Sequence, residues 1–112
     1  MTDTLPDDCR HYLSYTGVKL PLALVEELQP AQLENRITFF NGYYDGDGRL
    51  VAVRKMVYGE IEMEHRYEYS GEGVLQKAEI TDMDGEVTVL LFDGQGNPIR
   101  QGNRMKEPLD FA

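Results

Sequence analysis

The charged side chains with the most regular spacing lie in the segment 60–69. Polar and apolar residues alternate along it, which is the signature of a β-strand with one dry face and one solvated face. The apolar side carries Ile61, Met63, His65, Tyr67 and Tyr69, and the polar side carries Glu60, Glu62, Glu64, Arg66 and Glu68. Such a polar face could dock a basic partner, or it could hold a pair of acid–base carboxylates.

Catalysis by these carboxylates would need a pocket. A carboxylate works as a general acid or base where its surroundings shift its pKa toward the working pH, and an open strand face offers no such surroundings. We therefore expect a solvated surface and predict no catalytic residue. The candidate contact residues on this surface are Glu62, Glu64, Arg66 and Glu68.

Two further candidate binding residues, His65 and Tyr67, lie on the apolar side of the same segment. We expect a half-buried, hydrogen-bonded histidine there rather than a metal ligand or a general base. The other histidine, His11, is distant in sequence, so no histidine-rich metal site is indicated. If the sheet encloses a cavity, His65 and Tyr67 would instead converge on it as a ligand site.

Pairs of aspartates recur beside glycines. Asp45 and Asp47 are separated by one residue, as are Asp82 and Asp84, and calcium-binding loops begin this way because alternate carboxylates can converge on one cation. No glutamate closes the loop that would start at Asp45. The aspartates are therefore expected to serve the turns themselves, and we predict no metal site and no cofactor.

The composition argues against several classes of partner. The chain has 112 residues, with 20 Asp and Glu against 11 Lys and Arg, and a formal net charge of −9. Phosphate backbones and anionic membranes attract basic surfaces, so neither nucleic acid nor a membrane is an expected partner. A protein partner or a homodimer is compatible with this charge.

The single cysteine, Cys9, excludes an internal disulfide and a four-thiolate zinc site. The N-terminal residues also lack the apolar core of a secretory signal, so we predict a cytoplasmic protein of a bacterial type. Cys9 and His11 would share a face of a strand. Without a glycine-rich elbow nearby, a Cys–His nucleophile is not expected.

Short glycine-rich turns divide the chain. In residues 43–50 an aromatic run is followed by an Asp-Gly turn, and similar sequences recur at 69–75 and 92–99. Because Gly and Asp tolerate the positive φ of tight reversals, each stretch predicts a hairpin, and Asp84-Gly85 predicts a two-residue hairpin turn. The predicted strands of this part are 36–44, 49–58, 60–69, 74–81, 86–92 and 97–101.

The first part of the chain predicts another hairpin, over residues 11–25, whose second strand should lie at an edge or carry a break at Pro21, because Pro21 lacks an amide donor. One short helix is predicted near residues 30–35, where Pro30 suits a first helical position. The segment 86–92 is apolar on both sides, so we expect the first hairpin and the segment 26–36 to cover part of the second face of the sheet. A curled sheet or a dimer would bury that face equally well.

These elements predict a mainly β fold, a curved antiparallel meander of roughly six to eight strands that is open or partly closed like a barrel. Residues 9–102 should form a single β-rich domain. We expect residues 1–8 to be a disordered N-terminus and residues 103–112 to be a loosely ordered tail.

The run 44–50 resembles the tyrosine–aspartate (YD, Rhs-type) repeats, which build β-rich shells and spirals from strand pairs. The resemblance covers residues 43–101 and is close in the first copy, whereas Ser70 replaces the aspartate in the second and Phe92 replaces the tyrosine in the third. It implies a hairpin geometry and brings no catalytic residue with it. The run 12–21 followed by the meander is also similar to a small bacterial family with no assigned activity.

From these features we expect a small soluble, non-enzymatic accessory or binding protein that uses an open sheet face or edge. The alternative is a small-ligand carrier or an enzyme, with a cavity inside the curved sheet near His65 and Tyr67.

Overall fold

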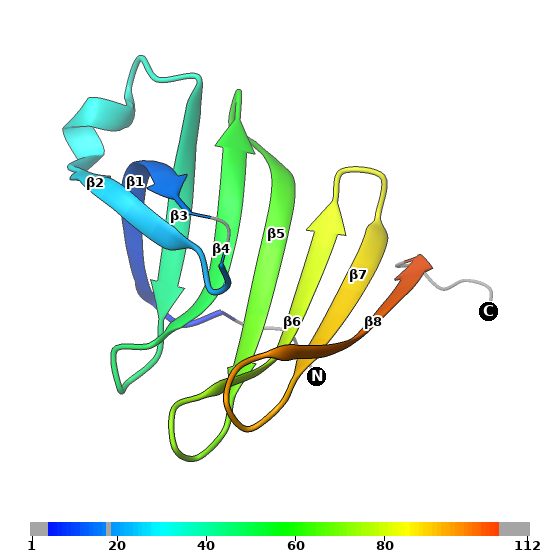
Figure 1. Cartoon of the computed structure of the whole chain (residues 1–112). Helices are drawn as coiled ribbons and strands as arrows, with labels where there is room; N and C mark the ends of the chain where they lie inside the picture. Colours follow the sequence, from blue (N-terminus) through cyan, green and yellow to red (C-terminus); the bar gives the residue numbers. More distant parts are fainter. Residues whose placement is uncertain (1–4, 18, 106–112) are drawn as a thin grey trace.

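Eight strands form one antiparallel sheet in the computed structural model, which describes residues 5–17 and 19–105 (Figure 1). The strands are β1 (Asp8–Thr16), β2 (Ala23–Leu28), β3 (Thr38–Tyr44), β4 (Leu50–Val57), β5 (Glu60–Tyr69), β6 (Leu75–Asp82), β7 (Glu86–Phe92) and β8 (Pro98–Met105). Their order is β2-β1-β3-β4-β5-β6-β7-β8, so the sheet is open and has β2 and β8 at its edges. The predicted mainly β, antiparallel fold is confirmed.

Strands β3 to β8 form a meander, in which each strand pairs with the next one in the chain. β5 and β7 have the bounds that the sequence predicts, whereas β8 continues to Met105, past the predicted end at residue 101. β1 begins at Asp8, the last residue of the segment expected to be disordered. Residues 1–4 and 106–112 of the two chain ends lie outside the described residues.

The β1–β2 hairpin covers part of one face of the sheet, which we call the inner face. The first part of β1 pairs with β3 and the later part, up to Thr16, pairs with β2. β1 therefore bends out of the sheet, and β2 crosses in front of β3 and β4 in Figure 1. Leu22, which precedes β2, is buried and donates its backbone N–H to the hydroxyl of Tyr67 on β5, 3.1 Å away.

The hydrophobic core lies between this hairpin and the inner face. Its buried members are Tyr12, Leu22, Phe40, Val53, Tyr67, Leu75 and Ala78. Gly42 on β3 leaves room for the hairpin, because a Cβ atom at this position would lie 2.7 Å from Cδ1 of Leu24 on β2. The predicted cover of the second face is thus present, and β2 lies at the edge as Pro21 predicts.

Four hairpin turns share one geometry. The side chain of the first turn residue accepts hydrogen bonds from the backbone N–H groups of the third and fifth residues. The fourth residue is a glycine with a φ of 80–85°. The first residues of these turns are Asp45, Ser70, Asp82 and Asp93. The prediction of a two-residue Asp84-Gly85 turn is therefore wrong, because the carboxylate of Asp82 organises a longer loop.

The connection from β2 to β3 contains one 3-10 helix, Pro30–Leu33, where the sequence predicts a short helix. Pro30 stands in its first turn, where a missing N–H leaves no hydrogen bond unmade. None of the four helical residues is buried. Within the segment 26–36, the buried residue Leu28 belongs to β2, so the hairpin and not the helix provides the cover from this segment.

Candidate binding surface on the outer face of the sheet

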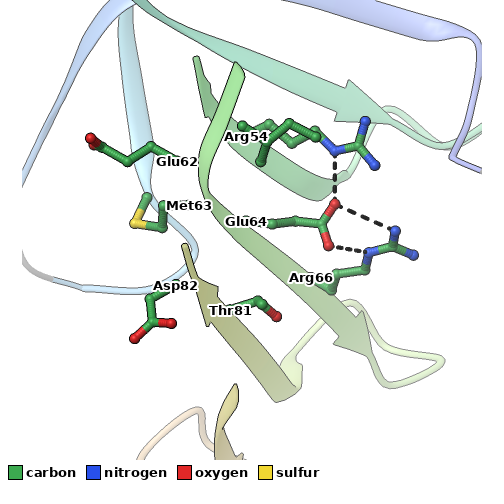
Figure 2. Close-up of a pocket in the computed structure, with 8 residues that line it drawn as sticks. Arg54, Glu62, Met63, Glu64, Arg66, Thr81 and Asp82 are labelled. Carbon is green, nitrogen blue, oxygen red and sulfur yellow. Dashed lines mark hydrogen bonds and ion pairs between the residues drawn. The ribbon is translucent and has the colours of Figure 1, made fainter. Parts of the chain in front are cut away.

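The opposite, outer face of β4, β5 and β6 carries a shallow hollow of about 380 Å³ (Figure 2). It is lined by Arg54, Ile61, Glu62, Met63, Glu64, Arg66, Thr81 and Asp82. Strand register brings the polar residues together, because Glu64 on β5 lies opposite Arg54 on β4 and opposite Thr81 on β6. Residues paired in this way point to the same face of a sheet. The predicted polar face of residues 60–68 therefore borders this hollow.

Glu64 is held between two arginines. Its Oε2 accepts a hydrogen bond from Nε of Arg54 at 2.7 Å, and its Oε1 accepts one from Nε of Arg66 at 3.2 Å (Figure 2). Glu64 is only 8% exposed, so the expectation of a solvated carboxylate is wrong here, because its arginine neighbours and the adjoining strands shield it. Burial by itself raises the pKa of Glu64, but the hydrogen bonds and charges of Arg54 and Arg66 outweigh it and lower this pKa below its ordinary value.

Basic residues of the neighbouring strands pair with other carboxylates of β5 and β6. Nζ of Lys55 lies 2.9 Å from Oε1 of Glu62. Nζ of Lys77 lies 3.2 Å from Oε2 of Glu79 and 3.8 Å from Oε2 of Glu68. Seen along β5 alone the face is acidic, but in the folded sheet it is a network of both signs. Four candidate contact residues lie in this network: Glu62, Glu64, Arg66 and Glu68.

The other two candidate residues, His65 and Tyr67, lie on the inner face and are 5% and 4% exposed. Nδ1 of His65 is 2.7 Å from the Tyr67 hydroxyl, which also accepts the N–H of Leu22. Burial lowers the pKa of His65 to about 4 and raises the pKa of Tyr67, so both rings are neutral at pH 7. The pair is a hydrogen-bonded part of the core, and its role in a ligand site stays a prediction.

Exposed apolar residues also gather at the β4–β5 turn, apart from the six candidate residues on β5. Tyr58 is 77% exposed, and Ile37 and Ile61 are 51% and 46% exposed. The N–H of Tyr58 donates to the carbonyl of Ile37 at 2.9 Å, which joins the turn to the start of β3, and Ile61 also lines the hollow. We call Ile37, Tyr58 and Ile61 the Tyr58 patch.

The backbone of Tyr58 has an uncommon conformation. Its φ is 53°, and that of Gly59 is 80°. Two successive positive φ values are typical of the type I′ turns that join hairpin strands tightly, where Asn-Gly is the preferred pair. The available sequence signal was therefore a bulky aromatic residue directly before a glycine, between two predicted strands.

The described part of the chain holds neither a candidate metal cluster nor a helix that could span a membrane. Residues 5–17 and 19–105 contain no group of three or more His, Cys, Asp or Glu side chains placed to hold a metal ion. Among the same residues, no helix is long and apolar enough to cross a membrane.

Comparison with known proteins finds a family whose function is unknown. No curated protein and no solved structure matches it. Nothing in these comparisons bears on the resemblance to tyrosine–aspartate repeats, which remains a similarity between turn sequences. A family described as of unknown function, DUF6156, matches residues 4–101, and the chain belongs to this family.

Proposed function

We propose that this protein is a small, non-enzymatic binding protein of the cytoplasm, that its partner is another protein, and that the Tyr58 patch is the centre of its contact surface. The conformation of Tyr58 carries the proposal. A left-handed backbone costs a bulky residue about 1–3 kcal/mol, and such strain is typical of functional positions. A tyrosine that is 77% exposed gains little from folding in return. Exposed aromatic residues of this kind are the usual anchors of protein interfaces.

The surroundings of the patch favour a partner with basic side chains around an apolar anchor. Glu60 follows the turn directly and is exposed, and Asp82 lines the adjoining hollow. The whole chain carries a formal net charge of −9. Complementary charge would speed the encounter with a basic surface and fix its orientation, so binding should weaken as the salt concentration rises.

Site-specific photocrosslinking tests where a partner binds. A photoreactive phenylalanine analogue is placed at position 58, and in a control chain at position 99, in cells of the source organism. Ile99 is also an exposed apolar residue, 62% exposed, and it lies near the opposite end of the sheet. A discrete protein adduct from position 58 that is absent from position 99 would support the proposal. No adduct, or the same adducts from both positions, would overturn it.

Replacing the strained residue separates folding from binding. We expect Tyr58→Asn to raise the free energy of unfolding by about 1 kcal/mol, because asparagine tolerates positive φ better. The same change should abolish formation of the crosslinked complex when the variant is used as a competitor. Urea unfolding measures the first effect. Tyr15→Asn, at an exposed tyrosine within β1, is the control and should not raise stability. A Tyr58→Asn chain that competes as well as the unaltered protein contradicts the proposal.

A further inference from the structure

The hairpin covers the inner face unequally. Leu22 and Leu24 of the hairpin contact residues of β5 and β3, whereas Leu90 and Phe92 of β7 stay only partly buried. Between the start of the hairpin connection and the β7–β8 turn lies a hollow of about 500 Å³. It is lined by Lys19, Leu20, Leu90, Phe92, Gln95, Gly96, Asn97 and Pro98. Small-molecule sites usually have volumes of roughly 300–1,000 Å³, so this hollow is large enough for one.

Its lining combines an apolar wall with a few polar groups. Aliphatic and aromatic surface comes from Leu20, Leu90, Phe92 and Pro98. Side-chain amides come from Gln95 and Asn97. Apolar walls with a small number of polar groups are typical of sites that bury an organic ligand and fix its orientation.

Lys19 gives the lining of this hollow a positive charge. Among the described residues that line this hollow, it is the one ionisable side chain, although the chain as a whole has a formal net charge of −9. Among the ion pairs found in the described residues, none involves Lys19. A cation beside an apolar wall, with no carboxylate among the described lining residues, is complementary to an apolar molecule that carries one anionic group.

We propose that this hollow binds a small amphipathic anion, with its hydrocarbon or aromatic body against Leu90 and Phe92 and its carboxylate or sulfonate group at Lys19. The site is independent of the Tyr58 patch. The turn that contains Gln95 and Asn97 and the turn that contains Tyr58 lie at opposite ends of the antiparallel meander (Figure 1). Failure of one proposal therefore leaves the other standing.

Two fluorescent probes with similar aromatic bodies test the proposal on the full chain. One is 8-anilinonaphthalene-1-sulfonate, which is anionic, and the other is N-phenyl-1-naphthylamine, which is neutral. We expect saturable binding of the anionic probe to one site per folded chain. The variant Lys19→Met keeps the aliphatic stem and removes the charge, and it should weaken binding of the anionic probe about tenfold while changing binding of the neutral probe less than twofold.

Two controls make the outcome decisive. Lys77→Met, on the outer face, removes an equal charge elsewhere and should leave both affinities unchanged. Leu90→Gln places a polar group in the wall and should weaken both probes, with circular dichroism confirming that the variant is folded. The proposal is overturned if the anionic probe does not saturate at one site, if Lys19→Met leaves its affinity unchanged, or if Lys77→Met has the same effect as Lys19→Met.

Discussion

The burial of His65 should make the stability of this protein depend on pH. Its ring is 5% exposed, and burial lowers its pKa to about 4 in the folded chain. In the unfolded chain the pKa is near 6.5, so between pH 6.5 and pH 4 the unfolded state binds a proton that the folded state does not. The free energy of unfolding should therefore fall as the pH falls through this window, by up to about 3 kcal/mol.

Replacement of each histidine isolates this effect. His65→Asn removes the titrating group and keeps an acceptor for the Tyr67 hydroxyl, and His11→Asn is the matched control at the only other histidine. Urea unfolding at pH 7 and pH 5 gives the difference in the free energy of unfolding for each chain. A loss of stability that a substitution causes equally at both pH values cancels in this difference. The difference should shrink for His65→Asn and persist for His11→Asn. If it is the same in both variants, another group is responsible.

Glu64 and Glu62 are only two positions apart in sequence, but they should contribute very differently to the free energy of unfolding. Glu64 has a side chain that is 11% exposed and bonded to two arginines, whereas the Glu62 side chain is 35% exposed and pairs with Lys55. Removing one partner of a shielded charge network leaves the others unpaired, so we expect Glu64→Ala to cost about 2–3 kcal/mol. Glu62→Ala should cost less than about 0.5 kcal/mol, as for exposed ion pairs. Equal losses in chemical denaturation would contradict this difference.

The four similar turns set the ends of the strands. In the turn that starts at Asp93 the carboxylate accepts N–H groups at 2.8 and 2.9 Å, whereas the hydroxyl of Ser70 accepts the equivalent groups at 3.2 Å. We expect Ser70→Asp to raise the thermal unfolding midpoint by a few degrees, because an ionised acceptor forms shorter and stronger hydrogen bonds. Asn at this position, with an uncharged acceptor, should give a smaller rise. A lower midpoint for Ser70→Asp would show that the added charge outweighs the hydrogen bonds.

Local elements could be predicted from sequence where local chemistry determines them. The two faces of β5 follow from alternation, and three turns follow from an Asp or Ser placed three residues before a glycine. The fourth turn was predicted at the right place but with the wrong length, because Met83 stands where the others have Gly46, Gly71 and Gly94. Those three glycines have no positive φ, so the turn does not require them. The burial of Glu64 was hidden, because Arg54 reaches it from another strand.

The pairing of β1 with β3 could not be read from sequence. β1 pairs with β3, whose residues lie about thirty positions further along the chain, while β2 follows β1 directly. The hairpin reaches its place through contacts that only the folded chain creates, such as the hydrogen bond from Leu22 to Tyr67 and the space above Gly42. The position of the hairpin in the folded chain therefore determines which part of the inner face is covered and leaves the hollow beside β7 open.

This arrangement predicts that the sheet opens from its β8 edge before its centre. β4 and β5 have strands on both sides, Ala52 and Val53 are 0% exposed, and the hairpin is bonded to β5. β8 pairs with β7 alone, and Leu90 and Phe92 of β7 are only partly buried. Elements with few buried contacts open locally, at a lower free energy than global unfolding.

Native-state hydrogen exchange followed by NMR measures this difference. Amides bonded between β4 and β5 should exchange with the free energy of global unfolding, and those bonded between β7 and β8 with about 2 kcal/mol less. The other edge is the internal control, because the β1–β2 hairpin is held to β5 through Leu22 and Tyr67 and should open later than β8. Equal protection of the β7–β8 and β4–β5 amides would mean that the sheet unfolds as one unit, and that the uneven cover of its inner face has no energetic consequence.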